Sequence, residues 1–218
     1  MDKGSTEMNG LSVVVADDHG LTLSAVSDSL EVNGLTIVAR ASGARDAVSA
    51  VLEHRPDALV IDLDLGPGPS GIHLAVSLRE RLPSLGVVIL SGYSDPRLLS
   101  SSLPDPPMGT VYLVKQEVAD VATVVAGVKE SVRRASTGAP STVPAVGLSR
   151  AQVQVLELIA QGLTNSAIAE QLHINEASVA KTTNRIAKRL GITQGAGTNT
   201  RGALTRRYFE LVGNRRQL

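Results

Sequence analysis

The chain has 218 residues but no cysteine and no tryptophan, and its aromatic residues are limited to one phenylalanine and three tyrosines. The absence of cysteine excludes a disulfide framework and suits a reducing cytoplasm, where we expect the protein to reside. Because aromatic residues are so few, the core must consist of Val, Leu, Ile and Ala, which are plentiful. A chain of this length corresponds to one or two domains.

Long apolar segments are also missing. No stretch approaches the ~18 apolar residues that a membrane-spanning helix requires, so we expect no membrane association. The first ten residues lack the apolar core of a secretory signal peptide, and we expect them to form a flexible tail.

Charge is divided unevenly along the chain, although the formal net charge is zero. Residues 1–133 hold 10 Lys and Arg against 17 Asp and Glu, whereas residues 134–218 hold 11 against 4. Such a difference between halves indicates two domains, of which the basic one has an anionic partner.

Four short apolar runs in the acidic half each end in polar residues that could bind an ion or take part in a reaction. The residues at these ends are Asp17 and Asp18, Asp62, Ser91, and Lys115. Open α/β sheets place their sites at the carboxyl ends of the strands, where these side chains would meet. Carboxylate oxygens there are the ligands that Mg²⁺ prefers.

The acidic half alternates between strand and helix patterns. Its strands are near-continuous apolar runs, as expected for a parallel sheet that is buried on both faces. A further strand is expected around Leu35–Ala39, and helices are expected over Leu21–Glu31, Ala44–Glu53, Leu74–Arg81 and Val118–Arg134. The pattern predicts a doubly wound, five-stranded parallel sheet.

This order of residues resembles the receiver domain of bacterial two-component response regulators, a flavodoxin-like fold, from about Leu11 to Arg133. The resemblance implies that Asp62 accepts a phosphoryl group from a sensor histidine kinase. It implies that Mg²⁺ is bound directly by Asp18, through water by Asp17, and further by Asp62 and the backbone carbonyl of Asp64. His19, which follows the acidic pair, is expected to be a loop residue.

The same resemblance assigns phosphoryl contacts and switching to Ser91, Tyr112 and Lys115. Mg²⁺ and Lys115 would neutralise the oxygens of the transferred group, because a carboxylate and an anionic donor repel each other. Taken alone, an acidic pair after a strand is more often a strand end or a helix cap. Five matching residue types in the right order on four runs favour the receiver.

Two departures from the family pattern affect the expected switch. The segment Ser100–Gly109 contains Pro104, Pro106 and Pro107, and proline is not tolerated inside a helix, so the fourth helix must be short or broken. The loop after Asp62 is one residue longer than usual in the family. The first departure puts the usual switching mechanism in doubt, because this surface carries the signal in receivers.

The basic half begins after a linker, residues 134–147, that is rich in Ala, Ser, Thr, Gly and Pro. A helix pattern follows Leu148–Ser149 and stops at Gly162, and a second helix is capped by Thr164 or Asn165. The turn His173–Asn175 leads to a third, basic helix. Two short helices, a tight turn and a basic helix predict a helix-turn-helix.

The third helix has two faces. Its core face comprises Val179, Thr183, Ile186 and Leu190, and its polar face comprises Lys181, Asn184, Arg185 and Lys188. A polar stripe alone is usually just solvated. The absence of acidic residues between Ala177 and Phe209, together with the preceding helix and turn, favours double-stranded DNA as the ligand.

Residues Leu148–Leu190 resemble the LuxR-type helix-turn-helix of NarL-type response regulators. The resemblance places base-reading positions at Ala180, Lys181 and Asn184, and it implies a fourth helix, Arg201–Val212, that supports a homodimer on DNA. Ala180 and Thr182 replace the usual Lys and His, so the operator preference of the family does not carry over.

We therefore expect a receiver domain over residues 10–133, a linker over 134–147 and an all-α DNA-binding domain over 148–213. The expected function is transcription control by phosphorylation, with Mg²⁺ as cofactor and no metabolic activity. One alternative is an atypical regulator that works without phosphorylation or through a ligand. Another is a phosphatase, because Asp62-Leu63-Asp64 is similar to the Asp-x-Asp of haloacid-dehalogenase-like enzymes, although their second acidic pair lies downstream.

Overall fold

The computed structural model describes residues 10–192 and 199–213, and these form two compact units. The first unit contains the described residues up to Ser91 together with Leu103–Val143. The second contains Gly92–Ser102 together with the described residues from Pro144 onward. The chain therefore passes between the units three times, whereas the sequence suggested a single passage through one linker.

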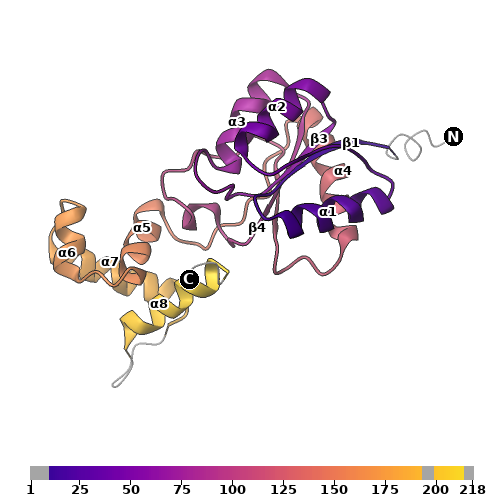
Figure 1. Cartoon of the computed structure of the whole chain (residues 1–218). Helices are drawn as coiled ribbons and strands as arrows, with labels where there is room; N and C mark the ends of the chain where they lie inside the picture. Colours follow the sequence, from indigo (N-terminus) through magenta and orange to yellow (C-terminus); the bar gives the residue numbers. More distant parts are fainter. Residues whose placement is uncertain (1–9, 193–198, 214–218) are drawn as a thin grey trace. The chain divides into compact units, whose positions relative to one another are not determined.

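The first unit is built on a five-stranded parallel sheet with strand order β2-β1-β3-β4-β5, which confirms the predicted fold (Figure 1). The strands are β1 (Ser12–Ala16), β2 (Thr36–Ala41), β3 (Ala58–Ile61), β4 (Gly86–Ser91) and β5 (Val111–Val114). Every residue of β3 and β4 is buried, as expected for central strands that are covered on both faces.

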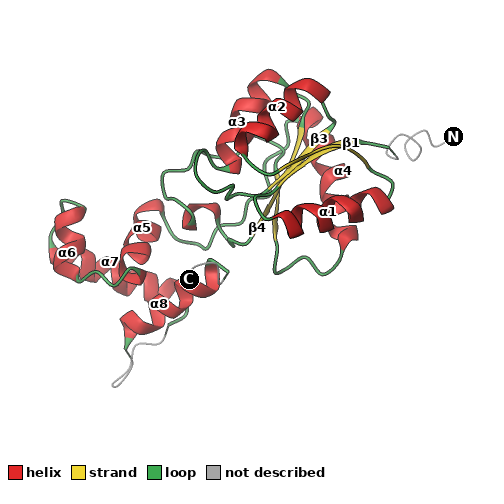
Figure 2. Ribbon diagram, in the orientation of Figure 1, coloured by secondary structure: helices red, strands yellow, loops and turns green. Residues whose placement is uncertain are grey.

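Four helices cover the sheet in two layers. Helices α1 and α4 pack together on one face, and α2 and α3 pack together on the other (Figure 2). Their bounds are α1 (Gly20–Val32), α2 (Ala44–His54), α3 (Gly71–Arg81) and α4 (Val121–Thr137). The layer under α1 and α4 is filled by aliphatic side chains, including Leu30, Val60 and Val128, in keeping with the scarcity of aromatic residues.

No α-helix joins β4 to β5 in residues 92–110, all of which the structure describes. The single helical turn there is the 3₁₀ turn η1 (Pro96–Leu98), capped by the side chain of Asp95. The sequence correctly predicted a short or broken fourth helix. Arg79 anchors the proline-containing stretch by donating to the carbonyls of Leu85 and Met108, at 2.5 and 2.8 Å.

The expected linker is partly structured. Helix α4 continues to Thr137, where Gly138 ends it in the left-handed conformation with φ of 64°. Thr142 then lies beside the edge strand β5: its amide donates to Thr110 O at 2.9 Å, and its hydroxyl accepts from the Tyr112 amide at 3.1 Å. This pairing satisfies backbone groups that an edge strand would otherwise expose.

The second unit carries four α-helices: α5 (Arg150–Ala160), α6 (Asn165–Gln171), α7 (Glu176–Arg189) and α8 (Thr200–Leu211). Ser149 and Gln152 form a capping box at α5, Thr164 caps α6, and Asn175 caps α7. Helices α6 and α7 pack against each other and α5 packs against α7 and α8, which confirms the helix-turn-helix.

Within the described ranges, none of the helices is long and apolar enough to cross a membrane. The loop that the sequence placed between the third and fourth helices of the basic half falls largely on residues 193–198, which lie outside the described residues.

Candidate functional site

Neighbouring strands of the sheet bring the predicted site residues together. Asp17 directly follows β1, Asp62 follows β3, Ser91 ends β4, and Lys115 follows β5. Backbone bonds fix these ends, because the Asp62 amide donates to Ala16 O at 2.8 Å and the Lys115 amide donates to Ser91 O at 2.7 Å. The predicted convergence at one edge of the sheet is therefore present in the structure.

Lys115 bridges two carboxylates at the centre of this site. Its Nζ atom donates to Asp17 Oδ2 at 2.6 Å and to Asp62 Oδ2 at 2.7 Å. The side chain of Asp62 is 0% exposed and that of Asp17 is 5% exposed. A buried carboxylate requires a partner, and here one ammonium group serves two of them.

Asp18 and His19 complete the acidic cluster at its solvent side. His19 lies in the loop before α1, as expected, and its Nδ1 atom is 2.8 Å from Asp18 Oδ1, while its amide donates to Asp17 Oδ1 at 2.8 Å. Donor atoms of Asp17, Asp18 and His19 all lie within 4.8 Å of one another, a spacing that could hold a cation. The carboxylate oxygens fit a hard divalent ion.

The loop after Asp62 packs closely against the side chain and the backbone carbonyl of Asp62. The Asp64 amide lies 3.3 Å from Asp62 Oδ1, and the Gly66 amide lies 3.3 Å from Asp64 Oδ1. A Cβ atom on Gly71 would lie 2.2 Å from the carbonyl oxygen of Asp62, so only glycine fits there. The metal contact expected of the Asp64 carbonyl stays a prediction.

Ser91 and Tyr112 are both buried, with 0% and 6% of their surfaces exposed. Ser91 ends the strand next to β3, close in the fold to Asp62, whereas Tyr112 lies within β5. The phosphoryl and switching roles expected of these residues stay predictions.

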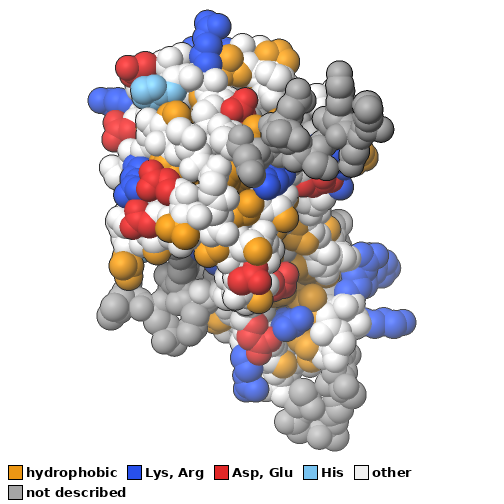
Figure 3. All heavy atoms as spheres, turned by 90° about the vertical axis from the view of Figure 1, so that its right-hand side faces the viewer, with side chains coloured by type: hydrophobic (Ala, Val, Ile, Leu, Met, Phe, Trp, Pro, Cys, Tyr) orange, Lys and Arg blue, Asp and Glu red, His pale blue; other side chains and the backbone are white. Residues whose placement is uncertain are grey.

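Several charged side chains elsewhere on the first unit form ion pairs near its surface. Acidic and basic groups lie interspersed on the face shown in Figure 3. Arg40 pairs with Asp28 at 2.7 Å, and hydrogen bonds from Arg133 and Arg134 lower the pKa of Glu130 to about 2. Pairs of this kind contribute little to stability, so the two buried carboxylates Asp17 and Asp62, which share one ammonium group, are the distinctive electrostatic feature.

Helix α7 presents the predicted polar face to solvent. Lys181, Asn184, Arg185 and Lys188 are exposed, whereas Val179, Thr183 and Ile186 are buried. Ala180 is half-buried. The exposed cations and the amide lie on one side of the helix, which is the arrangement that a helix needs to contact DNA phosphates and base edges.

A second charge cluster, at Asp95 and Arg97, was not predicted from the sequence. The order Asp95-Pro96 is typical of a helix start, since Asp is a good cap and Pro suits the first turn. Nothing in the sequence indicates that the Asp95 carboxylate also accepts a bond from the Val146 amide, which lies 51 residues further on, at 3.0 Å.

Two family models match the chain. The model for the response regulator receiver domain matches residues 13–121, and the model for bacterial regulatory proteins of the luxR family matches residues 146–196. The matches fall on the two halves that the charge distribution separates.

Similar full-length proteins are also known. The oxygen regulatory protein NreC of Staphylococcus epidermidis is 30% identical over 202 residues, which cover 84% of this chain and 92% of NreC. The structure of the two-component response regulator RcsB in complex with DNA matches with a TM-score of 0.56 at 24% identity, covering 94% of this chain and 100% of RcsB. RcsB from Salmonella enterica serovar Typhimurium, bound to promoter rprA in the presence of phosphomimetic BeF3-, has a TM-score of 0.52 at 22% identity and covers 91% and 98% of the two chains.

Proposed function

The chain belongs to the two-component response regulators with a luxR-type DNA-binding domain, and from this premise we propose that Asp62 is its phosphoacceptor. Members of this family are transcription regulators rather than enzymes, so the phosphatase alternative is set aside. The observation that supports Asp62 is its position: a fully buried carboxylate that shares the Lys115 ammonium with Asp17. We assign residues 10–133 to the receiver, except for Gly92–Ser102, and residues 148–213 to the DNA-binding domain.

The reaction needs a nucleophile, charge neutralisation and a leaving group. An oxygen of Asp62 attacks the phosphorus of a phosphohistidine on the sensor kinase, the phosphorus–nitrogen bond breaks, and its electron pair returns to the imidazole. Lys115 stays beside the carboxylate and balances the charge that the phosphoryl oxygens bring. Mg²⁺ would be held by Asp17, Asp18, Asp62 and the Asp64 carbonyl, and it would supply further neutralisation of those oxygens. The hydroxyl of Ser91 donates to a phosphoryl oxygen afterwards, and Tyr112 takes part in the switch.

The output of the protein is binding to double-stranded DNA. The complexes of RcsB with DNA, whose fold this chain shares, support this ligand. Lys181 and Asn184 are the sixth and ninth of the fourteen residues of α7, and they precede Arg185 and Lys188 on the exposed stripe. The N-terminal part of such a helix usually enters the major groove, so we assign base edges to Lys181 and Asn184 and phosphates to Arg185 and Lys188. We propose a homodimer on DNA, because two half-sites bound together gain effective concentration. Such a regulator works in the cytoplasm.

The phosphoacceptor is tested by incubating the protein with a small acyl phosphate and Mg²⁺ and locating the label by mass spectrometry. Label is expected on Asp62, and it should be absent from Asp62→Asn or after chelation of the metal. Asp64→Asn is the matched control, because it changes a carboxylate two residues away but keeps the backbone carbonyl. Equal labelling of Asp62→Asn and wild type would refute the proposal.

The DNA interface is tested by distinguishing the α7 side chains that contact base edges from those that contact phosphates. Asn184→Ala should cost about 1–3 kcal/mol on a selected site and relax the preference at one base pair. Lys188→Ala should weaken selected and scrambled DNA alike and lower the salt slope by about one. Both variants are titrated on both DNAs over a salt series. If Asn184→Ala weakens the two DNAs equally, this helix does not read bases as proposed.

A further inference from the structure

Residues Gly92–Ser102 follow the predicted switch residue Ser91 and belong to the DNA-binding unit. In a doubly wound sheet the stretch after a strand usually forms a helix that covers the sheet. Here it holds only the turn η1, and η1 packs against α5 of the helix-turn-helix. The segment is therefore an eleven-residue element of the DNA-binding unit that is attached by peptide bonds at both ends to the receiver.

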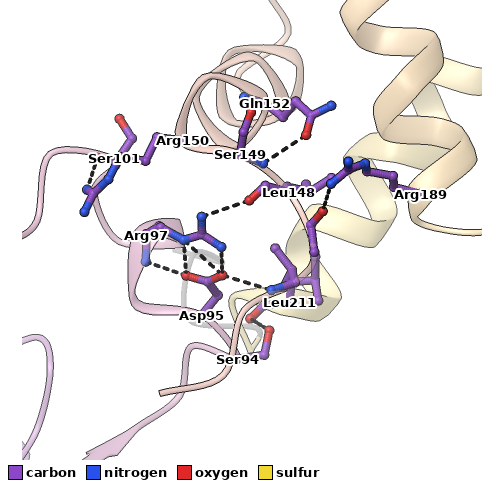
Figure 4. Close-up of polar contacts among 12 residues, drawn as sticks. Ser94, Asp95, Arg97, Ser101, Leu148, Ser149, Arg150, Gln152, Arg189 and Leu211 are labelled. Atoms are coloured by element: carbon purple, nitrogen blue, oxygen red, sulfur yellow. Dashed lines mark hydrogen bonds and ion pairs between the residues drawn. The ribbon is translucent and has the colours of Figure 1, made fainter. Parts of the chain in front are cut away.

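The Asp95 carboxylate is the centre of this attachment. Its side chain is 0% exposed, and it accepts from Arg97 Nη2 at 2.6 Å and Nε at 3.0 Å, and from the Arg97 amide at 2.9 Å (Figure 4). The Val146 amide, in the chain leading into α5, donates to it at 3.0 Å. Burial alone would raise the pKa of Asp95, but the bonds from Arg97 and Val146 outweigh it and hold the pKa below its ordinary value.

Further contacts extend the cluster to both ends of the helical unit. Arg97 Nη1 donates to the Leu148 carbonyl at 2.8 Å, just before the cap of α5, and Arg150 of α5 donates back to the Ser101 carbonyl at 2.9 Å (Figure 4). The amide and the hydroxyl of Ser94 each donate to Leu211 O at 3.0 Å, at the end of α8. The segment thus holds the start of α5 and the end of α8, two helices that pack on each other.

The distance along the chain from the switch residue to this cluster is short. Gly92 and Tyr93 alone separate Ser91 from Ser94, and both are buried. Two residues span at most about 7 Å when extended, so they can absorb only small displacements. A shift of Ser91 toward a phosphoryl group on Asp62 would pull on a segment that is fixed to α5 and α8.

We propose that Gly92–Ser102 is a coupling segment: it transmits the state of Asp62 to the DNA-binding unit by direct pull from Ser91, with Asp95 and Arg97 as the positioning residues that hold it. This inference rests on the proposed function. Where a receiver would have its fourth helix, this chain has a segment that already belongs to the DNA-binding unit.

The test compares the gain in DNA affinity on phosphorylation of the full chain in four proteins. In wild type, allosteric coupling of ordinary size gives a gain of about 5- to 150-fold. Asp95→Asn keeps an acceptor for the Val146 amide but removes the ion pair, and its gain should fall below about twofold with Asp62 labelling unchanged. Asp28→Asn makes the same charge change at the exposed pair with Arg40 and should keep the full gain.

The fourth protein carries two glycines inserted between Gly92 and Tyr93, which lengthens the connection and leaves every side chain of the cluster in place. Its gain should also fall below about twofold with normal labelling and normal basal DNA binding. If the insertion variant responds as wild type does, the pull is not the signal and the inference is wrong. An absence of label on wild-type Asp62 would instead refute the proposed function.

Amide hydrogen exchange gives a readout that does not depend on DNA. Asp95→Asn should speed exchange in residues 92–102 and at the adjoining ends of α5 and α8, while β1 and β3 keep wild-type rates. Arg97→Lys retains the charge but not the two-pronged contact, and its exchange rates should lie in between. Unchanged exchange in Asp95→Asn would contradict the assignment of Asp95 as a positioning residue.

Discussion

Two buried aspartates, Asp62 in the receiver and Asp95 in the DNA-binding unit, both pair with a cation, but the balance of charge around them differs. Asp62 shares the Lys115 ammonium with Asp17, and Asp18 lies beside them, so negative charge is in excess. Asp95 pairs with the guanidinium of Arg97 and accepts from two backbone amides, and the ion pair is balanced in charge. A site with excess negative charge can bind a cation and so change state. A carboxylate whose charge and hydrogen bonds are already matched holds its neighbours in a fixed geometry.

The largest effect is expected from removing the shared cation. Lys115→Ala should slow the labelling of Asp62 by an acyl phosphate by about 100- to 1000-fold, the range seen when one charge-stabilising group is lost from a site. Lys129→Ala, on α4, is the control and should label at the wild-type rate. The initial rate is measured by mass spectrometry, and a normal rate in Lys115→Ala would show that Lys115 is structural only.

A smaller effect is expected from removing the Asp95 carboxylate. Asp95→Ala should destabilise the DNA-binding unit by about 2 kcal/mol, because hydrogen bonds to a buried charge are lost and Arg97 is left without its ion-pair partner. Asp28→Ala, in an exposed pair, should cost less than about 1 kcal/mol. Because the chain has no tryptophan, amide exchange is the suitable measure of unfolding. It is followed in α5 and α8 for Asp95→Ala and in α1, which contains Asp28, for Asp28→Ala. Equal stability of the two variants would contradict the contrast between the pairs.

The smallest effect is expected from pH. The folded pKa of Asp95 is lowered from 3.8, so its ionised form stabilises the fold fully above that value, and the contribution is lost as pH falls through the folded pKa. The stability difference between wild type and Asp95→Asn should therefore be constant near neutral pH and shrink below about pH 4. If the stability difference instead grew as pH falls, Asp95 would be protonated in the folded protein, which would contradict this prediction.

The receiver site could be predicted because it depends on order along the chain. Parallel strands end at one edge, so Asp17, Asp62, Ser91 and Lys115 had to meet once the apolar runs were recognised as strands. The cap of α6 could be narrowed to Thr164 or Asn165 because capping is a local property of a few residues, and in the structure it is Thr164.

The coupling segment could not be predicted because its partners are distant in sequence. The prolines indicated that the fourth helix must be short or broken, but they carried no information on where the rest of this stretch would pack. Asp95 meets Val146 and Ser94 meets Leu211 only through tertiary structure. The pairing of Thr142 with β5 was missed as well. The residues around Thr142 have the composition of a linker, and the hydrogen bonds arise only because an edge strand lies beside them.

One titration tests whether Asp62 controls DNA binding. The full chain is titrated onto DNA that it selects from a random pool, with and without an acyl phosphate and Mg²⁺, in wild type and in Asp62→Asn. We predict that the phosphodonor raises the affinity of wild type by about 5- to 150-fold and leaves the affinity of Asp62→Asn unchanged. An affinity that responds equally in both proteins, or in neither, would contradict it.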